Sequence, residues 1–142
     1  MKKAFFASCI AATILTLTPL TASALEVIIV NKLPELYGDA FVSVTTDKSL
    51  ARYKAGKSKH ASHVINKKIA PGKAVTILKD SGAKSIQALH VSPGAWEWTY
   101  NTRIKGSRVR LEIVKIKGRE AAVIYSPQLK KYYYDTEQAY TY

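Results

Sequence analysis

The sequence predicts an all-β fold built as a single antiparallel β-sandwich. Short apolar or alternating runs recur along the chain with turn residues between them, a spacing typical of sandwiches and barrels. The clearest run is Arg108–Lys117, in which Val109, Leu111 and Ile113 alternate with charged residues. Such a strand has one apolar and one polar face. The chain is long enough for one domain with a modest core.

Eight strands are expected from these runs, in an immunoglobulin-like architecture. Ala70-Pro71-Gly72-Lys73 and Ser92-Pro93-Gly94-Ala95 are expected to form type II turns, since proline and glycine occupy their central positions. Lys117-Gly118-Arg119 is expected to form a tight hairpin. The expected strands are Glu26–Asn31, Ala40–Thr46, His63–Ala70, Ala74–Lys79, Ser85–Ser92, Ala95–Asn101, Arg108–Lys117 and Glu120–Ser126.

The segment Asp47–Ser62 interrupts the β pattern. Asp47 is expected to cap one short helix near residues 48–55, which Gly56 ends. A connection this long in a small domain is either functional or mobile. Gly56-Lys57-Ser58 also matches the end of a phosphate-binding loop, but Ala51 stands where the strict motif has glycine. We therefore do not expect nucleotide binding by that mechanism.

Residues 1–24 have the pattern of a cleaved signal peptide. Lys2 and Lys3 precede an apolar run, and Ala22-Ser23-Ala24 supplies the small residues before the expected cleavage site. The run has about 15 residues, fewer than the roughly 20 that span a bilayer. We expect a bacterial protein that is periplasmic or secreted and has no transmembrane segment. Residues 25–142 would then form a single β-rich domain that ends in a tyrosine-rich tail.

The expected mature chain offers few groups for catalysis or metal binding. The single cysteine, Cys9, leaves with residues 1–24, which excludes a disulfide, a cysteine nucleophile and thiolate metal ligands. His60 and His63 have no neighbouring acid or cysteine to complete a metal site, and the common hydrolase motifs are absent. We expect no enzyme activity, no cofactor and no metal, although a small hydrolase with an unrecognised site stays a minor alternative.

Positive charge is concentrated in two blocks. Between Asp47 and Asp80 the chain has no acidic residue, and the block from Arg103 to Arg119 is interrupted only by Glu112. Such blocks attract polyanions, whereas the alternative is that these side chains solvate strand faces and protect sheet edges. The predicted ligand-binding residues are Arg52, Lys54, Lys57, Lys59, Lys67, Lys68, Arg108 and Arg110.

Aromatic residues form two further candidate surfaces. Trp96, Trp98 and Tyr100 alternate, so they share one strand face, which would be a stacking platform if exposed and part of the core if covered. We expect this face to be buried, because a small domain without cysteine needs its large aromatic side chains in the core. The tail carries Tyr132, Tyr133, Tyr134, Tyr140 and Tyr142.

These observations favour an exported, non-catalytic binding protein. The expected partner is an anionic polymer or membrane surface, namely nucleic acid, lipopolysaccharide or anionic lipid, bound by the Lys/Arg-rich face. The alternative is a secreted protein–protein interaction module that uses the tyrosine-rich end to bind a host or cell-envelope protein.

Overall fold

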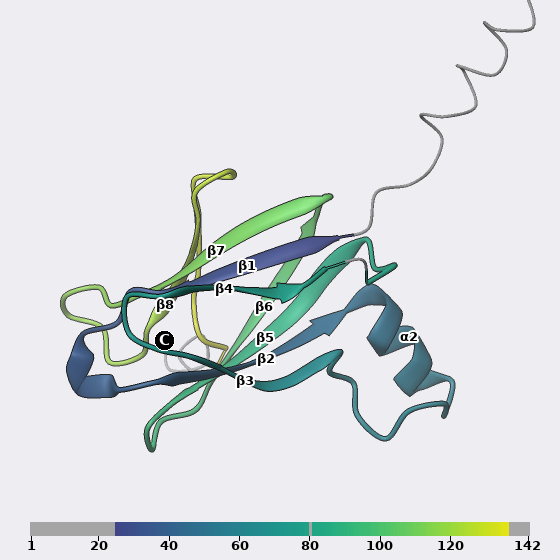
Figure 1. The fold of residues 1–142 in the computed structure, drawn as a ribbon, viewed down its shortest axis with the longest axis horizontal. Helices are drawn as coiled ribbons and strands as arrows, with labels where there is room; N and C mark the ends of the chain where they lie inside the picture. The colour runs from purple at the N-terminus through teal and green to yellow at the C-terminus, as the bar shows by residue number, and fades with distance from the viewer. Residues whose placement is uncertain (1–24, 80, 137–142) are drawn as a thin grey trace, which may run out of the picture.

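The computed structural model describes residues 25–79 and 81–136, and nine strands, one α-helix and one 3-10 turn account for its regular structure (Figure 1). The helix is α2 (Asp47–Lys54), and the turn is η2 (Glu35–Tyr37). The signal peptide predicted at residues 1–24 lies outside the described residues. The strands are β1 (Glu26–Asn31), β2 (Ala40–Thr46), β3 (Val64–Ile69), β4 (Ala74–Leu78), β5 (Ser85–Pro93), β6 (Trp98–Lys105), β7 (Arg108–Val114), β8 (Val123–Ser126) and β9 (Lys131–Tyr133).

Two sheets pack face to face, which confirms the predicted all-β sandwich. One sheet has the order β4-β1-β7-β8-β9, and the other has the order β3-β2-β5-β6. The order β3-β2-β5-β6 corresponds to strands C′, C, F and G of a variable-type immunoglobulin sheet, while β1 and β4 take the places of strands B and E. The place of strand A, beside strand B, is held by β7.

One strand pair of this antiparallel-rich sandwich, β1 with β7, is parallel. These strands run parallel, with Glu26 opposite Arg108 and Asn31 opposite Ile113. A parallel pair needs a long crossover connection, and here five intervening strands supply it. No local sequence pattern indicates that β7 pairs with β1, because the alternation in β7 fits parallel and antiparallel neighbours equally well.

The core consists of the inward faces of both sheets. Val109, Leu111 and Ile113 are buried as their alternation predicts, and Trp98 and Tyr100 on β6, in the other sheet, are also buried. Two-residue periodicity therefore placed the core side chains of these strands correctly.

Polar side chains join the two sheets in the absence of a disulfide. Asn31 Nδ2, at the end of β1, donates to the carbonyl oxygen of Ile69 on β3 at 3.0 Å. The Tyr100 hydroxyl, on β6, donates to the carbonyl oxygen of Ala122, beside β8, at 2.7 Å. Each such hydrogen bond contributes on the order of 1 kcal/mol net, and an unpaired buried partner costs more.

The turns agree with expectation at one position and differ at two. Lys73 N donates to Ala70 O at 3.1 Å and Gly72 has φ +74°, as a type II turn requires. In the second turn Trp96 N donates to Pro93 O at 3.2 Å, so this turn begins one residue later than expected and β6 starts at Trp98 rather than Ala95. The expected tight hairpin after β7 is a longer loop over residues 115–122. β9 was not among the eight expected strands.

No helix within the described ranges is long and apolar enough to cross a membrane.

Candidate functional site

Helix α2 begins with a capping box formed by Thr46 and Ser49. Ser49 N donates to Thr46 Oγ1 at 3.1 Å, and Thr46 N donates to Ser49 Oγ at 2.9 Å. Asp47 was expected to be the cap and instead is the first helical residue, because Thr46 already satisfies the free N–H group at this end.

Asp47 instead ties the start of α2 to the segment before β5. Its Oδ1 accepts hydrogen bonds from Lys84 N at 2.9 Å and Ser85 N at 3.1 Å. Burial acts to raise the pKa of Asp47, but hydrogen bonds from backbone N–H groups, led by those of Lys84 and Ser85, together outweigh it and hold the pKa below its ordinary value. This carboxylate is therefore committed to backbone groups outside the pocket described below.

The C-terminal end of α2 fixes Lys57 beside Arg52. Gly56, with φ +73°, donates from its N–H to Tyr53 O at 3.0 Å, and Lys57 N donates to Arg52 O at 2.9 Å. These two bonds form a Schellman motif, which needs the left-handed conformation that glycine adopts without strain. The glycine therefore determines where the Lys57 side chain leaves the backbone.

The loop after α2 returns the chain to β2. His60 N donates to Ser58 Oγ at 3.3 Å, and Ser58 Oγ donates to His60 O at 2.9 Å, which forms a tight local turn. His63 N then donates to Val44 O at 2.7 Å, and β3 begins at the next residue. The loop is thus held at both ends, and it brings His63 close to α2.

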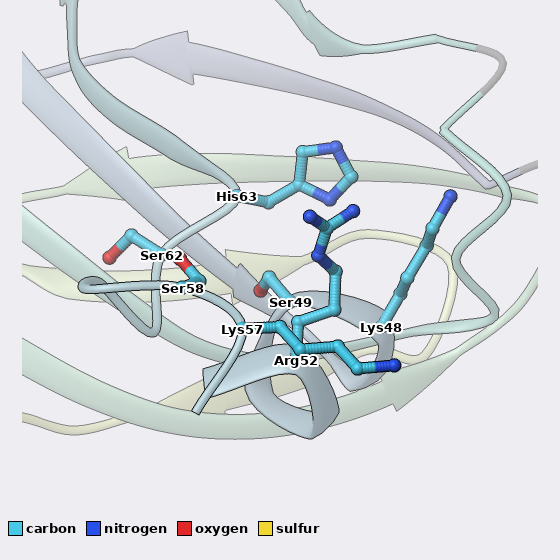
Figure 2. A pocket seen from close by; sticks show the side chains of 7 residues that line it. All are labelled: Lys48, Ser49, Arg52, Lys57, Ser58, Ser62 and His63. Carbon is cyan, nitrogen blue, oxygen red and sulfur yellow. The ribbon is translucent and has the colours of Figure 1, made fainter. Parts of the chain in front are cut away.

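A pocket of about 260 Å³ lies between α2 and this loop (Figure 2). In Figure 2 the guanidinium group of Arg52 and the imidazole ring of His63 point toward one another, with the Lys48 side chain alongside. We call this the basic pocket. No carboxylate is among its lining residues, which are Lys48, Ser49, Arg52, Lys57, Ser58, Ser62 and His63.

The cations of the basic pocket have no acidic partner among the described residues. The ion pairs of the described residues lie outside the pocket: they join Lys32 and Arg110 to Glu112, and Lys68 to Asp39. Lys48 Nζ donates to the carbonyl oxygen of Ser81 at 3.2 Å, which orients the amine without neutralising it.

His63 is half-buried in the pocket. Its Nδ1 lies 3.2 Å from Thr46 Oγ1. Burial, followed by the positive charges of Lys48 and Arg52, lowers the pKa of His63 below its ordinary value. The imidazole is therefore predominantly neutral at neutral pH.

The structure brings together only part of the predicted basic site. Arg52 and Lys57 line the basic pocket. Lys54 and Lys59 are exposed beside it without lining it, and Lys67 and Lys68 are exposed on β3. Arg108 and Arg110 lie on β7, in the other sheet from Lys67 and Lys68.

Lys48 and His63 line the basic pocket but were not among the binding residues predicted from the sequence. Lys48 and Arg52 are four residues apart on α2, a spacing that places them on one helix face, so the predicted helix contained a signal for this pair. His63 reaches the pocket through its backbone bond to Val44, a long-range contact that no local pattern indicates.

The aromatic platform is mostly core. Trp98 and Tyr100 are buried, whereas Trp96 is 43% exposed and its ring centroid lies 5.2 Å from that of Tyr37. Burial therefore excludes the predicted aromatic contact at Tyr100, Trp98 is accessible only where it lines a pocket, and Trp96 is the exposed residue of the three. Trp96 borders a second pocket of about 320 Å³ with Glu97, Trp98, Glu120 and Asp135.

The described part of the tyrosine-rich end is partly exposed. Tyr132 and Tyr134 are exposed, while Tyr133 is buried. The Tyr132 ring centroid lies 4.6 Å from that of Tyr125, and the Arg119 guanidinium lies 4.1 Å from the Tyr134 ring centroid. The predicted contributions of Tyr140 and Tyr142 lie outside the described residues.

Neither a metal centre nor a relative identifies the site. Within residues 25–79 and 81–136, no three histidine, cysteine, aspartate or glutamate side chains are grouped so that they could hold a metal ion. Comparison of the chain with protein-family models, with curated proteins and with solved structures gave no match. The charge and geometry of the basic pocket are therefore what indicate a ligand.

Proposed function

We propose that this chain is an exported, non-catalytic binding protein that engages an anionic polymer or surface through the basic pocket and the lysines around it. The observation that carries the proposal is the set of three cations, Lys48, Arg52 and Lys57, that line one pocket without a carboxylate. Nucleic acid, lipopolysaccharide and anionic lipid share the matching chemistry, which is a phosphate group.

The donors of the basic pocket suit a single phosphate group. The fork of Arg52 matches two oxygen atoms of a phosphate, and the amines of Lys48 and Lys57 act as point charges beside it. A volume of about 260 Å³ is below the roughly 300–1,000 Å³ of pockets that enclose whole small molecules. One charged group of a larger ligand is therefore the occupant that fits.

The exposed lysines outside the pocket would attract the rest of the polymer. Lys54 and Lys59 lie between residues of the basic pocket in the sequence, and Lys67 and Lys68 follow on β3. Exposed charges of one sign raise the local concentration of a polyanion and speed its association. These lysines would thus speed association of the polymer, whereas the pocket would slow its dissociation by holding one phosphate group.

A matched pair of charge reversals tests this proposal. Lys57 and Lys59 are both exposed and lie two residues apart, but only Lys57 lines the pocket. Binding of a fluorescently labelled oligodeoxythymidylate is measured for Lys57→Glu and Lys59→Glu. We expect Lys57→Glu to weaken binding by about tenfold or more, which corresponds to about 1.4 kcal/mol, and Lys59→Glu to weaken it clearly less.

Equal losses in the two variants would show that the pocket has no special role. Binding of the wild type that does not weaken with salt would contradict phosphate recognition altogether. The same comparison with vesicles of anionic phospholipid and with lipopolysaccharide identifies which source of phosphate the protein prefers.

A second candidate function is protein binding through the tyrosine-rich end. The observation that favours it is a group of exposed apolar side chains around the β8–β9 connection, where Leu129 is 56% exposed and Tyr132 and Tyr134 are also exposed. Tyrosine is enriched at protein interfaces. Binding to a protein partner that Leu129→Ser weakens and that salt hardly affects would favour this candidate over phosphate binding.

A further inference from the structure

We propose that His63 makes the basic pocket a proton-linked site, in which binding of a phosphate-type or sulfate-type oxyanion is accompanied by uptake of a proton on the imidazole. Affinity for such an anion then rises as the pH falls. This inference rests on the proposed function of the same pocket, and it adds a protein group that responds to pH.

The position of His63 makes it sensitive to the charge of the pocket. The imidazole faces the guanidinium group of Arg52, and Lys48 lies beside them (Figure 2). Two positive charges close to a half-buried ring disfavour a third. An oxyanion bound by Arg52 and Lys48 would offset both charges and so favour the imidazolium form.

The hydrogen bond to Thr46 permits protonation without rearrangement. Thr46 Oγ1 already accepts from Ser49 N, and it lies 3.3 Å from Ser49 Oγ and 3.2 Å from His63 Nδ1. A hydroxyl group has one proton to donate and two lone pairs. It can therefore donate to a neutral Nδ1, or accept from a protonated Nδ1 while its own proton turns to Ser49.

The other groups around His63 do not supply a competing negative charge. Lys48 and Arg52 reach it from α2, and Lys57 lines the same pocket from the loop. The carboxylate of Asp47 accepts from Lys84 N and Ser85 N. A bound oxyanion would thus be the negative charge that changes the protonation of His63.

The direction of the linkage follows from the two pKa values. In the free protein, the pKa of His63 is lowered by burial and by the positive charges of Lys48 and Arg52. The ring therefore loses its proton as the pH rises toward neutrality. A bound oxyanion raises this pKa, and between the two values the complex holds more protons than the free protein. Affinity therefore increases as the pH falls through this interval, by about tenfold for each unit that the anion adds to the pKa.

The ligand used in the test needs a charge that is constant with pH. Phosphodiesters and sulfate keep their charge between pH 5 and 8, whereas a phosphomonoester has a second pKa of about 6 and loses charge itself. We choose an oligodeoxythymidylate for affinity measurements and sodium sulfate for spectroscopy. The pH dependence then comes from the protein.

His60 provides the matched control. It lies three residues from His63 in the same loop, is exposed, and does not line the pocket. Oligodeoxythymidylate affinity is compared at pH 8 and pH 5.5, at constant ionic strength, for wild type, His63→Gln and His60→Gln. We expect the gain in affinity at low pH to be about threefold to tenfold larger in the wild type than in His63→Gln, and His60→Gln to behave like the wild type.

A second measurement uses the wild-type protein, so it does not depend on how a variant folds. The imidazole pKa values are measured by NMR with and without sodium sulfate, and we expect sulfate to raise that of His63 more than that of His60. An unchanged pKa of His63 in sulfate, or the same gain in affinity in His63→Gln as in the wild type, would overturn the inference. Absence of binding to the oligonucleotide, to anionic phospholipid vesicles and to lipopolysaccharide at both pH values would overturn the proposed function, whatever sulfate does to His63.

Discussion

The side-chain oxygen of Thr46 lies 3.2 Å from Nδ1 of His63 and also caps α2. One hydroxyl group thus connects the start of the helix to the residue that precedes β3. The geometry of the basic pocket depends on this connection, because Arg52 comes from the helix and His63 comes from the loop.

Replacing Thr46 by valine keeps the shape of the side chain and removes its hydroxyl group. We expect a loss of about 1–2 kcal/mol in the free energy of unfolding, because the first turn of α2 loses its cap and Thr46 is fully buried. Urea denaturation measures this loss. Thr46→Ser keeps the hydroxyl group and should retain most of the helix cap, so equal losses in the two variants would contradict the role of the hydrogen bonds.

Without ligand, His63 should make the domain less stable in acid. Its pKa is lowered on folding, so the unfolded chain binds more protons between the folded value and about 6.5. The free energy of unfolding should therefore be greatest above pH 7 and fall as the pH drops through this interval. His63→Gln should flatten the profile between pH 7 and 5 relative to His60→Gln. Two identical profiles would show that His63 titrates normally.

Gly56 should matter for both stability and ligand binding. Its φ of +73° lies in the left-handed region, and no atom lies within 4 Å of the position of an added Cβ, so Gly56→Ala introduces backbone strain of about 1–2 kcal/mol without a steric clash. Relief of that strain would move Lys57. Gly118→Ala has a comparable φ of +86° and open surroundings in the β7–β8 loop, so it should destabilise similarly and leave oligonucleotide affinity unchanged. A loss of affinity in both variants would show that the effect of Gly56→Ala on binding does not come from the position of Lys57.

Tyr100→Phe should destabilise the core while leaving ligand binding intact. The substitution removes the 2.7 Å hydrogen bond to the Ala122 carbonyl oxygen, and both residues are buried. An unpaired buried acceptor costs about 1–3 kcal/mol. Tyr132→Phe, at an exposed tyrosine, should change the free energy of unfolding by less than about 0.5 kcal/mol. Similar effects of the two substitutions in thermal denaturation would show that the Tyr100 bond does not join the sheets energetically.

Most of the fold could be predicted from local patterns. The bounds of β1 and β2 agree with expectation to the residue, because alternation and flanking turn residues mark both. The parallel pairing of β7 with β1 could not be predicted, since alternation within a strand carries no information about its neighbour. β9 has only three residues, too few for a clear period of two.

The candidate site could be predicted only in part. The run of basic residues indicated Arg52 and Lys57, which line the basic pocket, whereas Arg108 and Arg110 lie on the other sheet. Charge density along a sequence does not show which residues meet in space. His63 was missed because its position depends on long-range contacts with Val44 and Thr46.

The dependence of affinity on salt tests most directly whether the basic pocket holds a phosphate group. The dissociation constant for an oligodeoxythymidylate is measured from low to physiological salt for wild type, Arg52→Ala and Lys117→Ala, the last in the β7–β8 loop outside the pocket. Each phosphate contact with a single strand contributes about 0.7 to the slope of log affinity against log salt. We expect Arg52→Ala to weaken binding and to reduce the slope by about 0.7. Lys117→Ala should leave both the affinity and the slope unchanged. Equal slopes for Arg52→Ala and the wild type would contradict phosphate binding in the basic pocket.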